Sequence, residues 1–537
     1  MTLLSVEGLT LDIGAARLLD GVSFAMAEGE TFGLIGESGS GKSLTALAIM
    51  GLAPEGARTA GAVALAGRRL DGLSDRALCA VRGADVGMVF QEPMTALNPV
   101  RPIGAQVAET VLIHGRAGTR TAERIAAETL ARVGLPPERF PLSRYPHELS
   151  GGQRQRVVIA MAIALRPKLL IADEPTTALD VTTQAQILRL LKRLAAEDGM
   201  GLMLITHDLG VVADMADRVV VMREGRVVEA GPAERVLRAP SHGYTRALAA
   251  AARHAPLRAA PPAGGEAVLS VRDVVRDYAL PRARPFGPRP LFRAVDGVSF
   301  EVRRGETVAL VGESGCGKST LTRAILGLEE TQAGRIAVCG APIEGRRTTR
   351  AVRRRVQVVF QDPYGSFDPR WKAGDLIAEP FHLLDEPPKG AARREKIATA
   401  LAAVGLKPAD ADKYPHEFSG GQRQRLAIAR ALIIDPDLIV LDEATSALDV
   451  RVRAQVLDLL AGLSARLGLS YLFIAHDLGV VRAVADRVLV MQGGRIVEEG
   501  PTARVFDAPG HPYTATLLAA SPDLDRALAR RAARSVA

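Results

Sequence analysis

Two pairs of adjacent carboxylates and two glycine-rich turns are the residues of this chain with the clearest chemistry. Asp173-Glu174 and Asp442-Glu443 each end an apolar run, and the two pairs lie 269 residues apart. Carboxylates of this kind suit Mg²⁺ ligation and activation of water. GESGSGKS at 36–43 and GESGCGKS at 312–319 fit GxxxxGK[ST], the P-loop pattern. In a P-loop, backbone N–H groups, a lysine and a hydroxyl surround phosphates. Together these residues predict nucleotide hydrolysis, with the machinery present twice.

The runs around these residues predict the elements that must position them. TFGLIG and TVALVG are strand-like and lead directly into the glycine-rich turns, so each turn should join a strand to a helix. KLLIADE and DLIVLDE are nearly continuously apolar, which is typical of buried parallel strands. Ligands of open α/β sheets bind at the carboxyl ends of the strands. We therefore expect the turns and the carboxylates to meet at one edge of a sheet.

A long repeated stretch precedes each carboxylate pair. It reads YPHELSGGQRQR in the first half and YPHEFSGGQRQR in the second, with Ser150-Gly151-Gly152 and Ser419-Gly420-Gly421 expected to open helices. A helix N-terminus favours anions, so this turn is a second kind of phosphate-binding feature.

Single polar residues recur at matching places in the two halves. Gln91 and Gln361 follow the short strands VF, and His207 and His476 end the apolar runs GLMLIT and SYLFIA. A lone glutamine or histidine in such a place is usually structural. Each histidine, however, lies 34 residues after the aspartate of its half, and this equal spacing favours a functional role.

The organisation of the chain follows from the repeat. We predict a first domain at 1–249, an Ala- and Pro-rich linker at 250–267, and a second domain at 268–537 with a short C-terminal extension. Between the P-loop and the Ser-Gly-Gly turn of each half, which is called the signature below, we expect a helix with one buried face, because apolar residues are spaced four and three apart. These residues are Ala126, Leu130 and Val133, and Ile397, Leu401 and Val404.

Composition excludes several classes of protein. No apolar run approaches the roughly 20 residues that span a bilayer, and the N-terminus lacks a signal-peptide pattern. The three cysteines, Cys79, Cys316 and Cys339, are too few and too widely spaced for a disulfide framework, which fits a reducing cytoplasm. A net charge of +8 is small for 537 residues and does not indicate nucleic-acid binding. The Arg-rich stretches RARPFGPRPLFR and RALARRAARS are expected to be flexible, solvated tails.

The full ordered set of motifs resembles the nucleotide-binding domains of ATP-binding cassette (ABC) transporters. The resemblance covers essentially the whole chain, and GYT at 243–245 and HPYT at 511–514 make it similar to the oligopeptide, dipeptide and nickel importer subfamily, including fused ATPases for peptide, microcin-type peptide or glutathione uptake. The resemblance implies an α/β fold of two tandem P-loop NTPase domains. Each would have a RecA-like core, an antiparallel β subdomain and a helical signature subdomain.

The resemblance also implies roles for individual residues. The two cassettes would pair head to tail within the chain, each ATP being held by one P-loop and the opposite signature, with Asp180 and Asp449 bridging the halves. In the first half the ATP-binding residues would be Gly36, Glu37, Ser38, Gly39, Ser40, Gly41, Lys42, Ser43, Leu44, Gln91, Ser150, Gly151, Gly152, Gln153 and Asp180. In the second half they would be Tyr278, Gly312, Glu313, Ser314, Gly315, Cys316, Gly317, Lys318, Ser319, Thr320, Gln361, Ser419, Gly420, Gly421, Gln422 and Asp449. Mg²⁺ would be ligated by Ser43, Gln91 and Asp173 and by Ser319, Gln361 and Asp442, and catalysis would fall to Glu174, His207, Glu443 and His476.

The expected function is that of an ATPase that energises an importer for peptides or a related small solute. Its partners would be two membrane permease subunits and, indirectly, a secreted or periplasmic solute-binding protein, and it would lie peripherally on the cytoplasmic face of the bacterial inner membrane. The alternative is a soluble tandem ATPase acting on ribosomes or nucleic acid, but the short Pro/Ala-rich linker lacks the long charged helix typical of such translation factors.

Some positions depart from the family pattern. Tyr278 stands where the family usually stacks an aromatic ring on adenine, and Ile13 is its counterpart in the first half. Leu44 replaces the hydroxyl of Thr320. The cysteines lack the arrangement of an iron–sulfur cluster, so none is expected. Cys316, inside the second P-loop, lies near a helix N-terminus that should lower its thiol pKa, which gives the hypothesis of a reactive thiol, although a small tolerated residue is the favoured interpretation for native function.

Overall fold

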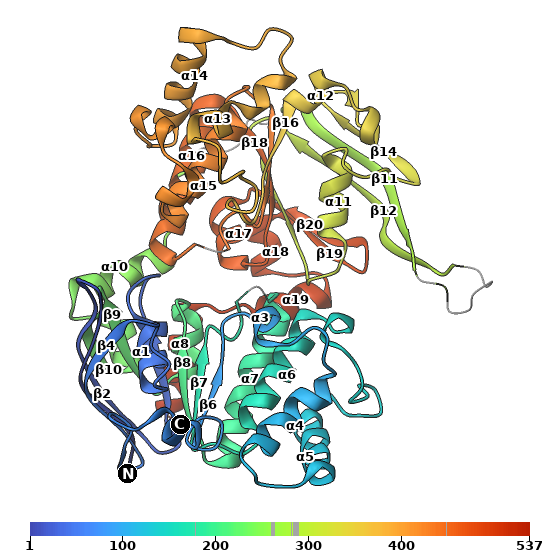
Figure 1. Cartoon of the computed structure of the whole chain (residues 1–537). Coiled ribbons are helices and arrows are strands. Elements are labelled where there is room, and N and C mark those ends of the chain that lie inside the picture. The colour runs from blue at the N-terminus through green and yellow to red at the C-terminus, as the bar shows by residue number, and fades with distance from the viewer. Residues whose placement is uncertain (178, 259–263, 281, 283–288, 447, 537) are drawn as a thin grey trace. The chain divides into compact units, whose positions relative to one another are not determined.

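The computed structural model describes residues 1–177, 179–258, 264–280, 282, 289–446 and 448–536 (Figure 1). The chain forms two compact units, and each contains one P-loop, one Ser-Gly-Gly turn and one carboxylate pair. The first comprises Met1–Leu179, Thr183–Arg253 and Pro522–Ala537, and the second comprises Asp180–Thr182 and His254–Ser521.

The first unit contains two sheets. An antiparallel sheet has the order β2-β1-β4-β5, with β1 Thr2–Ile13, β2 Ala16–Ala27, β4 Ala57–Leu65 and β5 Arg68–Arg69. A larger sheet has the order β10-β9-β3-β8-β7-β6, with β3 Thr31–Ile35, β6 Val86–Val89, β7 Leu169–Asp173, β8 Gly201–Ile205, β9 Arg218–Arg223 and β10 Arg226–Pro232. All neighbours in the larger sheet are parallel except β9 and β10. The α/β architecture expected from the motifs is therefore present.

The helices of the first unit divide between the core and a helical subdomain. They are α1 Lys42–Ile49, α2 Asp75–Cys79, α3 Pro93–Ala96, α4 Ile103–Ile113, α5 Thr119–Arg132, α6 Gly151–Ile163, α7 Val181–Asp198, α8 Leu209–Met215, α9 Ala233–Arg238, α10 Gly243–Ala252 and α20 Leu524–Val536. In Figure 1, α4, α5 and α6 lie together at one end of the unit and β2 and β4 lie at the other. The predicted face of Ala126, Leu130 and Val133 is fully buried there.

The second unit repeats this plan. Its antiparallel sheet, β12-β11-β14-β15, is formed by β11 Ala267–Ala279, β12 Leu291–Arg303, β14 Ala333–Val338 and β15 Ala341–Pro342. Its larger sheet, β16-β17-β18-β13-β19-β20, is formed by β13 Thr307–Val311, β16 Val356–Val359, β17 Leu438–Asp442, β18 Ser470–Ile474, β19 Arg487–Gln492 and β20 Arg495–Pro501. The helices are α11 Lys318–Ile325, α12 Arg350–Arg355, α13 Ala373–Ala378, α14 Gly390–Ala403, α15 Gly420–Leu432, α16 Val450–Leu467, α17 Leu478–Val484, α18 Thr502–Asp507 and α19 Pro512–Ala520. The predicted face of Ile397, Leu401 and Val404 is buried.

The central strands are buried because the antiparallel sheet and α1 or α11 pack on one face of the larger sheet and helices such as α6 and α7, or α15 and α16, pack on the other. Every residue of β3 and β13 is buried. The register places Ile205 beside Leu34 in one pairing and beside Asp173 in the other, so β3, β7 and β8 end at one edge. Three functional segments of the first unit therefore leave the sheet at adjacent points: the P-loop, the carboxylate pair and the histidine.

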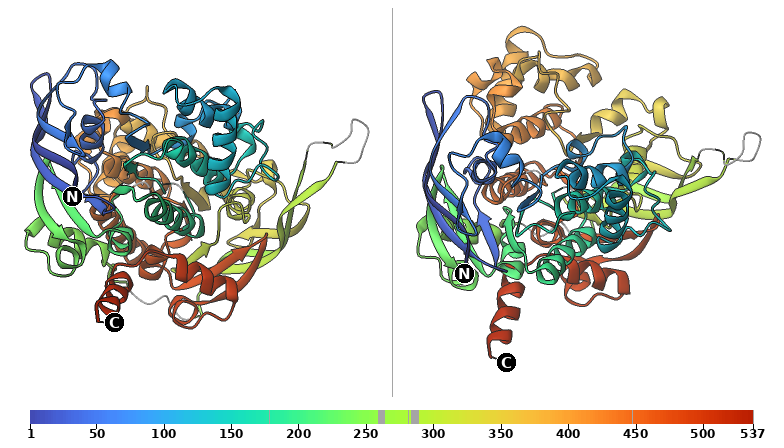
Figure 2. Two further views of the ribbon diagram at one scale, coloured as in Figure 1. Left: turned by 90° about the horizontal axis from the view of Figure 1, so that it is seen from below. Right: turned by 60° about the horizontal axis from the view of Figure 1, so that its bottom comes forward.

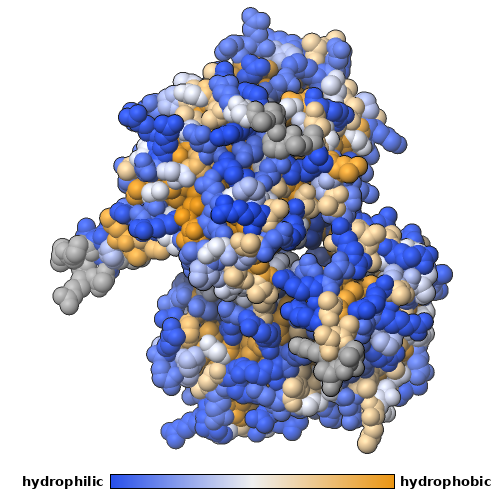
Figure 3. Space-filling view, turned by 180° about the vertical axis from the view of Figure 1, so that it is seen from behind, coloured by the Kyte–Doolittle hydropathy of each residue, from blue (hydrophilic) through white to orange (hydrophobic). Residues whose placement is uncertain are grey.

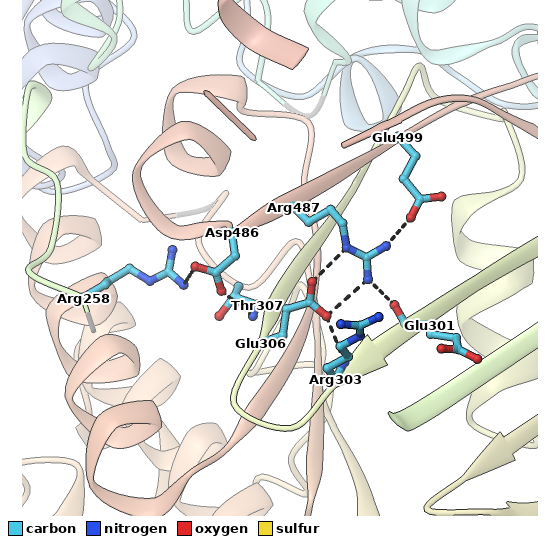
Figure 4. A network of polar contacts seen from close by, with 8 residues as sticks. All are labelled: Arg258, Glu301, Arg303, Glu306, Thr307, Asp486, Arg487 and Glu499. Carbon is cyan, nitrogen blue, oxygen red and sulfur yellow. Dashed lines mark hydrogen bonds and ion pairs between the residues drawn. The ribbon is translucent and has the colours of Figure 1, made fainter. Parts of the chain in front are cut away.

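The segment between the repeats contacts the second unit. Helix α10 extends to Ala252, and Arg258 then forms an ion pair with Asp486, 2.7 Å between Nη2 and Oδ1 (Figure 4). The other oxygen of Asp486 accepts a hydrogen bond from the backbone N–H of Thr307 at 2.8 Å. Beside it, Arg487 Nε donates to Glu306 Oε1 at 2.8 Å. The linker is thus held to this unit at Arg258 by a polar network.

The Arg-rich C-terminal stretch is a helix packed on the first unit, so the expectation of a flexible, solvated tail is wrong for its first turns. Helix α20 contacts α8, and Leu524, Ala527 and Leu528 are buried in the same cluster as residues of α8. Figure 2 shows α20 as the red helix that ends at C, beside green segments of the first unit. Half of the other Arg-rich stretch, residues 283–288, lies outside the described residues, and its last residues, Leu291, Phe292 and Arg293, belong to β12, so the expectation of a flexible tail is wrong for them.

Hydrophilic residues cover most of the face drawn in Figure 3, with smaller apolar areas between them. Among the described residues, no helix is both long and apolar enough to cross a membrane.

Candidate ATP-hydrolysis site

The P-loops have the local geometry that the glycine pattern predicts. Gly41 and Gly317 stand immediately before α1 and α11 with φ of 99° and 111°, a region that L side chains rarely adopt. A Cβ on Gly317 would lie 2.2 Å from the backbone oxygen of Ala294, so a side chain is also excluded sterically. These glycines let the backbone turn sharply into the helix and expose its first N–H groups.

Each P-loop lysine is folded back into its own loop. Lys42 Nζ donates to the carbonyls of Gly36 and Glu37, both at 2.9 Å, and Lys318 Nζ donates to those of Gly312 and Glu313 at 2.7 and 2.8 Å. The two lysines are buried. Electrostatic attraction joins Lys42 to Asp173 and Glu174, and Lys318 to Asp442 and Glu443, so each ammonium group lies near the carboxylates at the strand ends, where a nucleotide phosphate is expected.

Asp173 and Asp442 have the properties of metal ligands. Burial raises the pKa of Asp173 to about 6, although hydrogen bonding with Ser43 opposes the shift. Among the described residues Asp173 Oδ1 has no hydrogen-bond partner, although Asp173 is only 5% exposed. Burial, followed by the charge of Glu443, also raises the pKa of Asp442. An unpaired buried carboxylate oxygen close to a hydroxyl fits the oxygen-rich ligation of Mg²⁺.

Glu174 is held by three side chains in a strained backbone conformation. Gln91 Nε2 and Thr177 Oγ1 donate to Oε2 at 2.9 and 3.0 Å, and His207 Nδ1 lies 3.1 Å from Oε1. The φ of Glu174 is 45°, and that of Glu443 is 49°. Such a conformation costs about 1–3 kcal/mol for a non-glycine residue and is concentrated at functional sites.

Among the described residues, fewer contacts hold the glutamate of the second unit, and no hydrogen bond joins Gln361 to Glu443. His476 Nδ1 lies 3.4 Å from Glu443 Oε2, and the Ser446 hydroxyl donates to the backbone carbonyl of Glu443 at 2.9 Å. Burial would raise the pKa of Glu174 and of Glu443, but hydrogen bonding and charge from His207 and His476 outweigh it and lower both. Both glutamates are therefore ionised at neutral pH and can accept a proton from water.

The signature residues form helix N-termini within their own units. Ser150 and Gln153 make a reciprocal capping box at the start of α6, and Ser419 and Gln422 make the same box at the start of α15. Ser150, Ser419 and Gly420 are exposed. The first N–H groups of α6 and α15 are therefore presented at the surface, where an external phosphate can reach them.

Each unit therefore brings together, within itself, some of the residues predicted to form one ATP site. In the first unit, contacts join Ser43, Gln91, Asp173, Glu174 and His207 at the strand ends beside Lys42. Asp449 caps α16, accepting a hydrogen bond from Val452 N at 3.0 Å, and Asp180 accepts one from Thr182 Oγ1 at 2.7 Å. The ATP and metal contacts assigned to these residues remain predictions.

The expectation for Cys316 is wrong. Its thiol is buried, and burial raises the pKa of Cys316 even though Lys318 acts in the opposite direction. Desolvation of the thiolate outweighs the attraction of Lys318, and Cys316 packs in a hydrophobic cluster, which fits the interpretation of a small residue tolerated in the P-loop.

Tyr278 is engaged by neighbouring polar side chains. Its hydroxyl donates to Glu329 Oε2 at 2.5 Å, and the guanidinium carbon of Arg276 lies 4.6 Å from the ring centroid. In the first unit, Ile13 and Leu44 instead pack against the apolar core of the unit. Adenine stacking on Tyr278 remains a prediction.

Sequence reasoning missed two tyrosines that contact the P-loops. Tyr244 Oη accepts a hydrogen bond from Glu37 N at 3.1 Å, and Tyr513 Oη accepts one from Glu313 N at 2.9 Å. Both belong to the GYT and HPYT motifs, whose repetition was noted but whose contacts across some 200 residues cannot be read from spacing. The histidine before each motif caps the following helix in both units, so the change from Pro512 to Gly243 leaves the cap intact.

Comparison with known proteins gives consistent matches. The family model "ABC transporter" matches residues 19–177 and 295–446, and the model "Oligopeptide/dipeptide transporter, C-terminal region" matches 228–266 and 497–536. A protein named "Glutathione import ATP-binding protein GsiA" from Salmonella choleraesuis is 46% identical, covering 97% of this chain and 90% of that protein. Its namesake from Escherichia coli K12 is 47% identical, with coverage of 97% and 89%. A solved cassette from Clostridium perfringens, part of an ABC transporter complex, is 28% identical, with a TM-score of 0.40 over 45% of this chain and 92% of that one.

Proposed function

Because this chain belongs to the ABC transporter family and is the ATP-hydrolysing subunit of an importer, we propose that the importer's cargo is glutathione or a related short peptide. Relatives at 46–47% identity over 97% of the chain are named as glutathione import proteins, which supports this cargo. The ribosome-acting alternative is not favoured, since these relatives serve import.

ATP hydrolysis at each site uses residues of the chain in separate roles. Lys42 and Lys318 supply positive charge to the terminal phosphates. Glu174, ionised and oriented by Gln91 and His207, accepts the proton of the attacking water, and Glu443 and His476 do the same in the second unit. The observation that carries this assignment is the strained, hydrogen-bonded glutamate at the end of β7.

Mg²⁺ fits the donor set in each unit. Ser43, Gln91 and Asp173 would hold it in the first unit, and Ser319, Gln361 and Asp442 in the second. When bound, the ion neutralises charge that develops on the phosphate oxygens. The raised pKa of Asp173 and its unpaired oxygen support this assignment.

Each ATP site is completed, in this proposal, by the signature serine of the opposite cassette. The exposed N-termini of α6 and α15 support it, because each presents backbone N–H groups to a phosphate from outside its own unit. In a chain whose second site is silenced by Glu443→Gln, Ser419→Arg should abolish the remaining turnover and Ser150→Arg should largely spare it. The reverse pattern would contradict the exchange.

The membrane partners are permeases, and we propose that there are two, supplied by a periplasmic solute-binding protein, with this chain on the cytoplasmic face of the inner membrane. A hollow of about 600 Å³ in the second unit is lined by Leu328, Phe360 and Trp371, next to Gln361. These three side chains are exposed, as are Leu52 and Phe90 at the positions in the first unit that match Leu328 and Phe360. A cytoplasmic apolar segment of each permease would bind at these exposed side chains, next to the loop that carries Gln91 or Gln361, and would change the position of that loop.

The test is reconstitution of this chain with its permeases in vesicles that enclose ATP, with the solute-binding protein added outside. Uptake of labelled glutathione should require hydrolysable ATP, and Trp371→Ala should weaken assembly while leaving nucleotide binding intact. ATP-dependent uptake of other short peptides with none of glutathione would revise the cargo, and uptake unaffected by loss of ATP would overturn the function.

A further inference from the structure

Helix α20 is a part of the first unit for which the catalytic site gives no reason. Its apolar residues Leu524, Ala527 and Leu528 follow the spacing of one helical face and are 7%, 1% and 4% exposed. They share a cluster with Leu209, Val212, Ala213 and Ala216 of the α8 region. The C-terminal helix therefore completes a hydrophobic core around α8.

Arginine side chains of α20 bind the C-terminal end of α8. Arg531 Nε donates to the carbonyl of Ala213, and Nη2 donates to the carbonyl of Ala216, both at 2.5 Å. The last carbonyls of a helix lack intrahelical partners, and a cation there is also favoured by the helix dipole. Arg530 adds an ion pair with Asp214 at 3.1 Å.

The segment leading into α20 covers the other end of α8. A Cβ built on Gly210 would lie 3.0 Å from the backbone nitrogen of Asp523 and 3.2 Å from the carbonyl carbon of Pro522. Gly210 is buried, and its N–H donates to the capping carboxylate of Asp208 at 2.8 Å. Residues 522–536 therefore contact α8 at both of its ends.

The connection from α8 to the chemistry is short. Helix α8 begins two residues after His207, and Asp208 between them caps the helix. His207 Nδ1 in turn lies 3.1 Å from Glu174 Oε1. A displacement of α8 would therefore be passed directly to His207 and to its contact with the glutamate.

We propose that residues 522–536 act as a positioning element of the first ATP site, fixing α8 so that His207 stays against Glu174. Arg531 and Leu528 are positioning residues, because they touch α8 and not the reacting atoms. This inference rests on the proposed function. In the part of the chain that the structure describes, no such element covers the matching helix of the second site, since Gly479 and Arg482, which match Gly210 and Ala213, are exposed on α17.

The test measures the first site alone, in a chain carrying Glu443→Gln. Three changes should weaken the contact between residues 522–536 and α8. They are a chain ending at Ser521, which removes these residues, Arg531→Ala, and Gly210→Ala, whose Cβ would meet Pro522 and Asp523. The matched controls are Gly479→Ala in the second unit, where an added Cβ meets only the Asp477 carboxylate at 3.2 Å, and Arg526→Ala, an equal charge loss at an exposed position of α20.

We expect kcat of the first site to fall about tenfold on truncation, because small displacements of catalytic groups cost factors of this order or more, while KM for ATP changes less than about twofold. Arg531→Lys should give an intermediate kcat, since it keeps the charge but not the two-pronged contact. Amide hydrogen exchange in α8 should rise in the same variants. In the complementary Glu174→Gln chain, truncation should leave turnover unchanged.

Two results would overturn the inference. The first is an unchanged first-site kcat in the truncated chain together with faster exchange in α8, because α8 would then be released without consequence. The second is an equal loss of turnover at both sites, which would indicate general destabilisation. Absence of hydrolysis in the unaltered chain would instead overturn the proposed function itself.

Discussion

The helix that follows the histidine is enclosed in the first unit and open to solvent on one face in the second. Helices α8 and α17 begin with the same four residues, LGVV, and both are capped by an aspartate. They differ at the fifth position, where α8 has Ala213 and α17 has Arg482. Ala213 leaves room for α20, whereas Arg482 occupies that face, pairing with Asp507 and lying 5.9 Å from the Phe506 ring centroid. The exposed face of α17 therefore carries a charged side chain where α8 carries a small buried one.

The two units also differ near the predicted adenine position. The second unit has a polar cluster of Arg276, Tyr278 and Glu329, whereas the matching residues of the first, Leu11, Ile13 and Ala53, belong to its apolar core. Repeats with the same catalytic residues can therefore differ in what surrounds them. The predictions below distinguish residues that have the same role at both sites from residues whose role differs between the sites.

The largest effect is expected at the glutamates. Glu174→Gln with Glu443→Gln should lower steady ATP turnover at least about 100-fold, because general-base catalysis is lost, while ATP binding is kept. The measurement is phosphate release alongside equilibrium nucleotide binding. Turnover in the two single variants shows how much each site contributes to hydrolysis. Undiminished turnover in the double variant would refute the assignment of Glu174 and Glu443 as general bases.

The next effect concerns the tyrosines at the P-loops. Tyr244→Phe and Tyr513→Phe each remove the acceptor of a P-loop N–H, at a cost of about 1–1.5 kcal/mol, which corresponds to about five- to tenfold weaker ATP binding at the matching site. Binding to each site can be measured with the other P-loop lysine replaced. Equal affinities in the variants and the unaltered chain would show that these bonds do not support the loop.

A smaller effect is expected at the adenine position. Tyr278→Ala should weaken ATP binding at the second site about threefold to tenfold, from loss of aromatic contact. The matched variant Ile13→Tyr should strengthen binding at the first site if the missing ring limits it. Fluorescent nucleotide titration distinguishes these outcomes, and no change in either variant would remove the adenine role.

A pH-dependent effect on stability is expected at Glu229, which organises the turn before α10. Burial would raise its pKa, but hydrogen bonds from the Ser241 hydroxyl and from the backbone N–H groups of Ser241 and His242, with the Thr245 hydroxyl nearby, outweigh it and lower the pKa of Glu229 to about 2. Its stabilisation is therefore present above its unfolded pKa and is lost as the pH falls through about 2. Glu229→Gln should lower the free energy of unfolding of the first unit by about 1–2 kcal/mol at pH 7. A denaturant series from pH 7 to 3 should show this difference shrinking below about pH 4.5.

The smallest effect is expected at the cysteines. Because burial raises the pKa of Cys316, alkylation at neutral pH should modify exposed Cys79 first and leave second-site turnover intact at short times. Mass spectrometry of the labelled chain checks the order. Rapid modification of Cys316 that ATP prevents would restore the earlier expectation of an activated thiol.

Local pattern identified much of the site because phosphate chemistry demands particular residues at fixed short spacings. The P-loop glycines, Glu174 and His207 could be chosen from the sequence since each lies at the end of an apolar strand, and parallel strand ends converge. The strained φ of Glu174 and its bond to Gln91 could not, because they depend on how separate strands are packed.

The sequence by itself determined the two cassettes, their strand ends and the residues that carry charge, since these follow from side-chain chemistry and periodicity. Tertiary structure alone decided which tyrosine supports each P-loop and where the last helix packs. The many arginines of the C-terminal stretch led to the expectation of a solvated tail, and the apolar face of Leu524, Ala527 and Leu528 became evident only where it packs against α8. Only the folded chain brings Ala213, small enough to accept α20, and Arg531, able to bind the end of α8, into contact across more than 300 residues.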